Sequence, residues 1–189
     1  MRVIGGSVRG RRLASPDNGR IRPTADRVKE SLFSILSSLL GNLNGLRVLD
    51  ICAGTGNLGI EALSRGAESA LFIDNHQESA RLVAKNLDLS GLAMRGMILE
   101  KDAIAALDAL AGREKPFNLV FLDPPYRQGL AESILWRLST SPLVDSSTLV
   151  VAETEAREEL PTAMGALVQF DRRIYGDTAI VFFEKRPIV

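Results

Sequence analysis

The stretch that decides the fold is Asp-Ile-Cys-Ala-Gly-Thr-Gly-Asn-Leu-Gly, residues 50–59. It joins an apolar run at 46–51 to a helical pattern at about 57–65. Gly54 and Gly56 permit a tight turn and let a ligand approach the backbone closely. The free N–H groups at the start of the following helix suit a carboxylate or a phosphate equally well. The stretch therefore predicts a strand, a ligand-binding loop and a helix in succession.

Short apolar runs alternate with amphipathic helical patterns along the rest of the chain. Further strands are expected at 70–73, 97–99, 118–122 and 148–152, with a final antiparallel pair at about 167–174 and 178–184. The pattern predicts an α/β fold with a doubly wound, mostly parallel seven-stranded sheet and an antiparallel C-terminal strand pair.

A helix is expected before the first strand. Thr24 is a candidate N-cap, and Asp26 lies in the first turn. The side chains that define its expected buried face are Val28, Leu32, Ile35, Leu36, Leu39 and Leu40. Their spacing is that of an amphipathic helix.

Acidic side chains occur where the expected strands end. The four are Asp50, Asp74, Asp102 and Asp123. Because ligands of open α/β sheets bind at the carboxyl ends of the strands, we expect these acids to line one edge of the sheet. Asn75 is expected to cap the helix that follows the second of them.

The loop at 50–59 leaves two kinds of cofactor open. Gly54, Gly56 and Gly59 form a literal G-x-G-x-x-G, and Asp74 follows Gly54 by twenty residues, as in nicotinamide dinucleotide sites. Asp50 favours a different ligand, because its negative charge would attract an ammonium group and repel a pyrophosphate. The D-x-x-x-G-x-G pattern also resembles the first motif of the class I methyltransferases.

That resemblance implies a Rossmann-like methyltransferase fold and S-adenosylmethionine as the cofactor. By the same resemblance, the cofactor-binding residues are Asp50, Ala53, Gly54, Thr55, Gly56, Asp74 and Asp102. Asp74 would bind the ribose hydroxyls and Asp102 would lie near the adenine, with helix N-capping as the alternative role of both. Cys52 is assigned no chemistry, because nothing near it would activate a thiolate.

The second informative stretch is Asp123-Pro124-Pro125-Tyr126, which follows the apolar run at 118–122. Each proline fixes its own φ and restricts the residue before it, so Asp123 and Pro124 are held extended. The Asp123 carboxylate and the Pro124 carbonyl could accept both N–H groups of an exocyclic base amine. These hydrogen bonds would strengthen as the nitrogen becomes positive during methyl transfer. Tyr126 could stack on the base.

The four residues of this stretch are the candidate catalytic residues, and an ordinary Pro-Pro turn after a strand is the simpler alternative. The tetrapeptide resembles the [DNS]-P-P-[YF] motif of amino-methyltransferases. That motif occurs in enzymes acting on adenine, cytosine, guanine and protein glutamine, so it leaves the substrate open.

The N-terminal segment carries an excess of positive charge. Residues 1–30 have a net charge of +5, and the remainder of the chain has −5. Arg9, Arg11 and Arg12 are candidates for contacts with RNA phosphates, which would be sensitive to salt and blind to sequence. The alternative is a solvated basic loop. We therefore divide the chain into a basic arm at 1–24, expected to form a hairpin, and a methyltransferase domain at 25–189.

The arm also carries a family resemblance. The segments Arg2-Val-Ile-Gly-Gly, Arg9-Gly-Arg-Arg-Leu and 21–33, Ile-Arg-Pro-Thr-Ala-Asp-Arg-Val-Lys-Glu-Ser-Leu-Phe, resemble the N-terminal signature of the RsmD family. The resemblance extends through 48–67 and Asp123–Tyr126 to Tyr175-Gly176-Asp177. It implies methylation of the 2-amino group of a guanine in bacterial 16S ribosomal RNA. Arg22 and Thr24 could then pack over the cofactor or substrate, with a surface arm and a helix cap as the alternative.

The expected partner is 16S rRNA or an assembly intermediate of the small ribosomal subunit, bound by a cytoplasmic monomer without membrane contact. The single cysteine excludes an intrachain disulfide, and no run is long enough to span a membrane. No Cys/His cluster suggests a metal. Three rival functions remain: an adenine amino-methyltransferase on DNA or RNA, a non-catalytic RNA-binding module, and a nicotinamide-dependent oxidoreductase.

Overall fold

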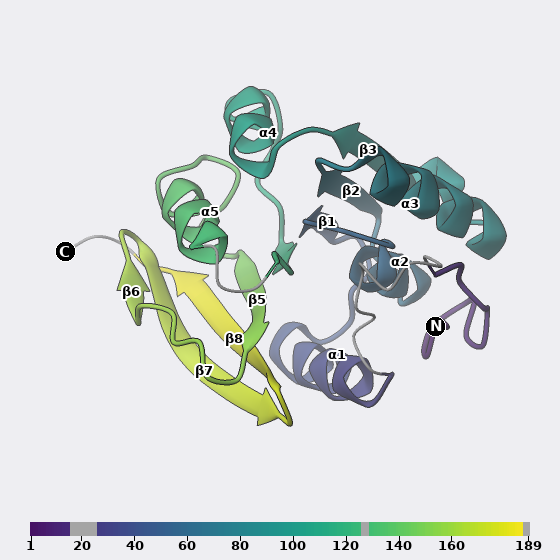
Figure 1. Ribbon diagram of the computed structural model, residues 1–189, viewed down its shortest axis with the longest axis horizontal. Helices are drawn as coiled ribbons and strands as arrows, with labels where there is room; N and C mark the ends of the chain where they lie inside the picture. Colours follow the sequence, from purple (N-terminus) through teal and green to yellow (C-terminus); the bar gives the residue numbers. More distant parts are fainter. Residues whose placement is uncertain (16–25, 126–128, 187–189) are drawn as a thin grey trace.

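An eight-stranded sheet with the order β3-β2-β1-β4-β5-β8-β7-β6 organises the computed structural model (Figure 1). The structure describes residues 1–15, 26–125 and 129–186. The strands are β1 (Arg47–Ile51), β2 (Ser69–Asp74), β3 (Gly96–Glu100), β4 (Leu119–Leu122), β5 (Leu149–Glu155), β6 (Ala163–Met164), β7 (Leu167–Tyr175) and β8 (Thr178–Lys185). The helices are α1 (Asp26–Leu40), α2 (Asn57–Ser64), α3 (Gln77–Ser90), α4 (Ala103–Leu110), α5 (Leu130–Ser139) and the 3-10 helix η1 (Ala93–Arg95).

Strands β3, β2, β1, β4 and β5 are parallel, as the alternation of apolar runs and helices predicts. Strand β8 pairs antiparallel with β5, and β7 and β6 continue the antiparallel part. The predicted fold class is confirmed. The described residues contain one strand beyond the seven expected, the two-residue β6. Two residues are too few to leave a periodic pattern in the sequence.

Helices cover both faces of the sheet. Figure 1 shows α1, α2 and α3 on one face and α4 and α5 on the other, and each face has its own buried apolar cluster. On the first face, the rings of Phe33 in α1 and Phe121 in β4 lie 5.9 Å apart. The central strands are therefore apolar on both sides, which is why they appear in the sequence as continuous apolar runs.

Two details of the helices differ from expectation. In α1, Leu39 is 48% exposed, while Lys29 and Phe33 are fully buried. Because Phe33 contacts the sheet, the buried face of α1 includes Phe33 and Lys29 and excludes Leu39. At the start of α3, the N-cap is His76 instead of Asn75. The His76 side chain makes no capping hydrogen bond, and Asp74 Oδ1 accepts the His76 N–H at 2.9 Å, which fixes the turn before the helix.

The described part of the N-terminal arm, residues 1–15, folds back on itself and packs against the domain. Arg2 and Arg12 form an antiparallel bridge, and the Val3 N–H donates to the Arg11 carbonyl at 2.9 Å. Val3 is fully buried in the core cluster shared with α1 and α2. The Ser7 N–H donates to the carbonyl of Ser64 at the end of α2, at 2.7 Å. These contacts hold the arm against α2, the helix that follows the candidate cofactor loop at residues 50–59.

Candidate active site

A cavity of about 670 Å³ opens at the carboxyl ends of the parallel strands. This volume lies in the range of small-molecule and cofactor sites, about 300–1,000 Å³. Its walls come from the loop after β1, the start of α3, the start of α4 and the turn after β4. The edge of the sheet predicted from the strand-end acids is therefore the place where the fold forms a ligand-sized cavity.

The strand register brings four acids to one face of the sheet. Asp50 of β1 is opposite Phe72 of β2 and Phe121 of β4. Side chains two residues apart in a strand point the same way, so Asp74 and Asp123 share the face of Asp50. On β5, Ala152 is opposite Leu122, which makes Glu153 the neighbour of Asp123. The acids that line the cavity are Asp50, Asp74, Glu78, Asp102, Asp123 and Glu153.

Asp50 lies under the cofactor loop and is 2% exposed. Its Oδ2 accepts the backbone N–H of Gly59 at 2.9 Å. Burial raises the pKa of Asp50 to about 7, although the Gly59 hydrogen bond opposes this shift and the nearby Asp74 adds to it. A cationic group in the cavity would favour the ionised form of Asp50, whereas a phosphate would meet a carboxylate.

The glycines of the loop are required by its geometry. Gly54 and Gly56 have φ angles of 57° and 75°, and Gly56 is the N-cap of α2. A Cβ on Gly59 would lie 2.3 Å from Phe72 Cε1 and 2.9 Å from Asp50 Oδ2. Gly59 therefore lets α2 pack closely on the sheet, so its role does not require a dinucleotide.

Asp74 fixes the loop from the neighbouring strand. Its Oδ2 accepts the Gly54 N–H and its Oδ1 accepts the His76 N–H, both at 2.9 Å. Asp102 caps α4 by accepting the Ala105 N–H at 3.0 Å, and it is exposed at the cavity wall. A carboxylate has about four acceptor positions, so Asp74 and Asp102 can both accept further hydrogen bonds from a ligand.

Cys52 has an unusual backbone and an inert thiol. Its φ is 60°, which makes it the one positive-φ residue other than glycine in the described chain. Burial and four nearby acids raise the pKa of its thiol to about 12. The thiolate is therefore scarce at neutral pH, in keeping with the absence of any chemistry assigned to this cysteine.

The turn after β4 faces the same cavity. Asp123, Pro124 and Pro125 line it, and Pro124 is buried. The Asp123 N–H donates to the Ile51 carbonyl at 3.2 Å, which ties the turn to the end of β1. Desolvation raises the pKa of Asp123 well above its usual value, and the charges of Glu153 and Asp50 add to the effect. Tyr126 lies outside the described residues.

Sequence reasoning missed Glu153. It predicted a strand ending at Ala152, but β5 continues to Glu155. Glu153 is 6% exposed although it lies at the cavity. An acid placed directly after four apolar residues, as Asp123 is in the β4 pattern, was the signal that could have revealed it.

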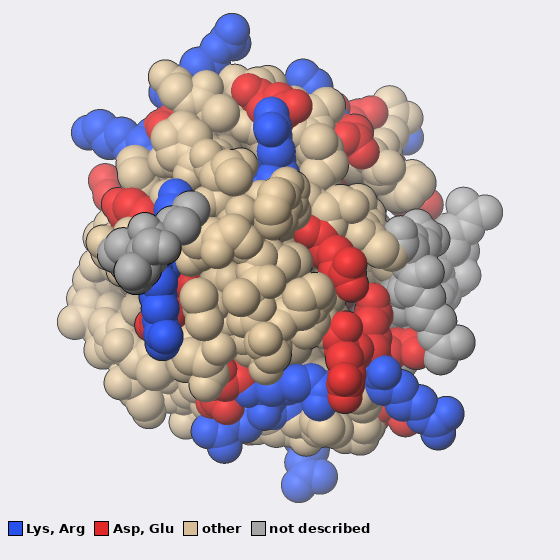
Figure 2. Space-filling view, turned by 90° about the vertical axis from the view of Figure 1, so that its left-hand side faces the viewer, with Lys and Arg blue, Asp and Glu red and all other residues tan. Residues whose placement is uncertain are grey.

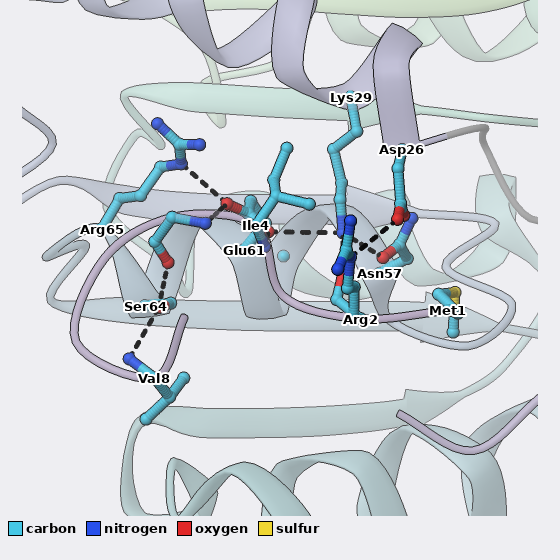
Figure 3. A network of polar contacts seen from close by, with 12 residues as sticks. Met1, Arg2, Ile4, Val8, Asp26, Lys29, Asn57, Glu61, Ser64 and Arg65 are labelled. Carbon is cyan, nitrogen blue, oxygen red and sulfur yellow. Dashed lines mark hydrogen bonds and ion pairs between the residues drawn. The ribbon is translucent and has the colours of Figure 1, made fainter. Parts of the chain in front are cut away.

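Two buried polar residues connect the arm with the cofactor loop. Asn86 of α3 exchanges hydrogen bonds with Ala14 and donates to the Thr55 carbonyl at 2.9 Å. Lys29 donates to the Arg2 carbonyl and to Asn57 Oδ1, both at 2.7 Å (Figure 3). Neither side chain was singled out from the sequence.

The candidate substrate residues are only partly described. Arg9, Arg11 and Arg12 are exposed on the arm, whereas Arg22 and Thr24 lie outside the described residues. Figure 2 shows a different face, where acidic and basic side chains adjoin around a broad uncharged area.

In the described ranges, no group of three or more potential ligand side chains is placed to hold a metal ion. None of the described helices has the length and apolar character to cross a membrane.

Comparison with known proteins gives full-length matches. The family model described as "Conserved hypothetical protein 95" matches residues 1–184. Ribosomal RNA small subunit methyltransferase D of Escherichia coli (strain K12) is 34% identical over 185 residues, covering 98% of this chain and 90% of that protein. YlbH of Bacillus subtilis (strain 168) is 38% identical over 186 residues, covering 98% of this chain and all of YlbH.

The solved structure of yhhF from Escherichia coli has a TM-score of 0.83 to this chain at 34% identity. The match covers 98% of this chain and 97% of yhhF. It therefore includes the arm, the cofactor loop and the turn after β4. The chain belongs to the RsmD family of methyltransferases, whose family model carries the description "Conserved hypothetical protein 95".

Proposed function

We propose that the protein transfers a methyl group from S-adenosylmethionine to the 2-amino group of a guanine in 16S rRNA. The observation that carries the proposal is that one cavity is lined both by the cofactor loop and by Asp123 and Pro124. The relative named ribosomal RNA small subunit methyltransferase D supports ribosomal RNA of the small subunit as the substrate. The choice of guanine rests on the family resemblance of the arm.

The residues of the cavity fit S-adenosylmethionine. Asp50 and Asp74 place negative charge beside the loop, which suits the amino group and sulfonium of this cofactor and disfavours a pyrophosphate. Asn57 also lines the cavity, and its buried Nδ2 has no hydrogen-bond partner among the described residues. Because Lys29 holds Asn57 Oδ1, the Nδ2 atom remains a donor for an acceptor such as a carboxylate. When bound, the cofactor supplies an electrophilic methyl group.

The protein's part in the reaction is to bind and orient the amine. The Asp123 carboxylate and the Pro124 carbonyl accept its two N–H groups, and the two prolines set the direction of both acceptors. These hydrogen bonds become stronger as the attacking nitrogen gains positive charge, so they stabilise the transition state more than the bound substrate. Tyr126 is proposed to stack on the base.

The arm is proposed to contribute RNA affinity. Arg9, Arg11 and Arg12 are exposed, and Lys29 and Asn86 hold the described arm beside the cofactor loop. Phosphate contacts from these arginines would position the RNA, while the cavity selects the base. In this proposal residues 1–24 serve as the RNA-binding arm of a catalytic domain at 25–189. The protein acts as a cytoplasmic monomer on 16S rRNA or a small-subunit assembly intermediate.

The direct test uses labelled S-adenosylmethionine with 16S rRNA and with small-subunit particles lacking the modification. Digestion of the product should yield N2-methylguanosine. Asp123→Ala should lower the transfer rate by roughly 100-fold or more, while cofactor affinity measured by calorimetry stays within a few-fold of wild type. Asp88→Ala, which removes an exposed acid of α3, is the matched control. Methylated adenine as the product would support the adenine alternative, and unchanged turnover would remove Asp123 from the mechanism.

A further inference from the structure

Asp123, directly after β4, and Glu153, within β5, occupy corresponding positions on neighbouring parallel strands. Leu122 of β4 is opposite Ala152 of β5, and the next residue on each strand is an acid. Neighbouring strands lie about 4.8 Å apart, and residues in register point to the same face. The two carboxyl groups therefore approach the same part of the cavity, which both residues line.

Glu153 lies in an apolar part of the sheet. It is 6% exposed, and its partner on β8, Ile180, is 1% exposed. Glutamate is rarely this buried, because removing an ionised carboxylate from water is costly. A buried acid that lines the same cavity as the proposed amine-binding carboxylate is therefore a candidate for a chemical role.

The charges acting on Asp123 are carboxylates from the two adjacent strands. Glu153 acts from β5 and Asp50 acts from β1, and both raise the pKa of Asp123 in addition to its desolvation. Asp50 already accepts the Gly59 N–H on the side of the cofactor loop. Glu153, the stronger of the two influences, lies on the other side of Asp123. Two carboxylates on adjacent strands ionise together only at a high electrostatic cost, which favours a proton shared between them.

We propose that Glu153 is a further catalytic residue, which shares one proton with Asp123 and helps this pair to take up the proton that the methylated amine loses. This inference rests on the proposed function. Asp123 provides the acceptor that binds the amine, and Glu153 holds the shared proton before the reaction. Without Glu153, Asp123 would have to perform both tasks.

The reaction forms one bond to carbon, breaks another and moves one proton. The nitrogen lone pair forms the new bond to the methyl carbon, and the carbon–sulfur bond breaks with its electrons remaining on sulfur. The nitrogen is then cationic. One N–H bond leaves its electrons on nitrogen, and its proton moves to the ionised carboxylate of the pair. The pair changes from one proton and one negative charge to two protons, and it returns one proton to water when the product leaves.

The first measurement needs no substrate. Carbon-13 NMR of protein labelled at the aspartate carboxyl would follow Asp123 from pH 4 to 10, with Asp123→Asn identifying the signal. In wild type the pair should titrate in two steps. In Glu153→Gln, Asp123 should titrate in a single step with its midpoint lower by about one unit or more. A midpoint that moves by less than about 0.3 unit would show that the two groups share no proton.

The second measurement is the single-turnover rate of methyl transfer against pH, with saturating cofactor. Glu153→Gln should lower the maximal rate by about 100-fold, the usual scale for losing a proton-transfer group, and move the acidic limb to lower pH. Glu153→Asp keeps a carboxylate and should recover part of the rate. A lower midpoint of Asp123 with an unchanged rate would contradict the role in proton uptake.

Glu100→Gln is the matched control, because Glu100 ends β3 at the same edge of the sheet and is exposed. It should leave both measurements as in wild type. Cofactor affinity by calorimetry and thermal unfolding would show that Glu153→Gln is folded. If wild type failed to methylate rRNA, the proposed function would fall, whereas the NMR titration would still decide whether Asp123 and Glu153 form a pair.

Discussion

Lys29 Nζ lies 3.3 Å from Glu61 Oε2, and neither side chain is exposed to solvent (Figure 3). Glu61 also accepts the N–H groups of Ile4 and Gly5, both at 2.8 Å. The ion pair thus joins α1 and α2, while Glu61 holds the arm in place. Desolvation lowers the pKa of Lys29, although the charge of Glu61 opposes this shift.

Lys29→Met should destabilise the protein by about 3 kcal/mol, because it leaves Glu61 buried without its lysine partner. Urea unfolding at neutral pH would measure the decrease in unfolding free energy. Arg27→Met is the control, since Arg27 is an exposed residue of the same helix. Equal stability of the two variants would show that the other partners of Glu61 suffice to hold its charge.

Gly59→Ala should destabilise the protein and weaken cofactor binding. Its Cβ would meet the Phe72 ring at 2.3 Å and Asp50 Oδ2 at 2.9 Å, so α2 must move from the sheet. Overpacking of this kind costs about 1–3 kcal/mol. Adding Phe72→Leu removes the ring atoms in contact, so the second substitution should cost less in the Gly59→Ala background than alone. Strict additivity in urea unfolding would refute the proposed contact.

Asp50 should make the stability of the ligand-free protein depend on pH. Its pKa of about 7 in the folded state lies above the ordinary value of 3.8, so the folded state binds the proton more tightly. The contribution of Asp50 to the unfolding free energy therefore falls as the pH rises from about 4 to 7. Asp50→Asn should flatten this decline and be more stable than wild type at pH 8. If the unfolding free energy fell equally with pH in wild type and in Asp50→Asn, Asp50 would not be the group responsible.

Cofactor binding should release a proton from Asp50. An ammonium group beside the carboxylate favours its ionised form, so S-adenosylmethionine should displace protons near pH 6.5. Calorimetry in two buffers of different ionisation enthalpy would detect this as different binding enthalpies. Asp50→Asn should remove most of the difference. Tighter binding of NAD than of S-adenosylmethionine would contradict the proposed cofactor.

Reversing charge at Arg9, Arg11 and Arg12 should weaken RNA binding and flatten its salt dependence. Removing one phosphate interaction should reduce the slope of log affinity against log salt by about 0.7–0.9. The control reverses three other exposed arginines, Arg157, Arg173 and Arg186. Filter binding of a 16S rRNA fragment at several salt concentrations would compare the two sets. Equal weakening by both sets would mean that net charge alone, and no specific surface of the arm, binds the RNA.

The order of the helices and strands was predictable because the apolar periodicity of the central strands is strong. Asp50, Asp74 and Asp123 were located for the same reason: each lies at the end of such a run or directly after it. The two-residue β6 and the N-cap of α3 depend on a few local hydrogen bonds, which leave no repeating pattern. Sequence reasoning therefore missed β6 and placed the N-cap of α3 one residue too early.

The polar contacts between distant segments were not predictable. Lys29 and Glu61 are 32 residues apart, and Asn86 and Ala14 are 72 apart. A lysine inside a helical pattern normally indicates a solvated face, so its burial depends on a partner that only the fold supplies. The apolar run before Glu153 could have marked it as a strand-end acid, but its place beside Asp123 becomes visible only when β4 and β5 are placed in register.

The most direct test is to map methylated guanines in 16S rRNA from cells with and without the gene for this protein. Loss of one N2-methylguanosine is expected on deletion, with recovery when wild type is supplied and no recovery with Asp123→Ala. An unchanged set of N2-methylguanosines in the deleted strain would contradict the proposed function.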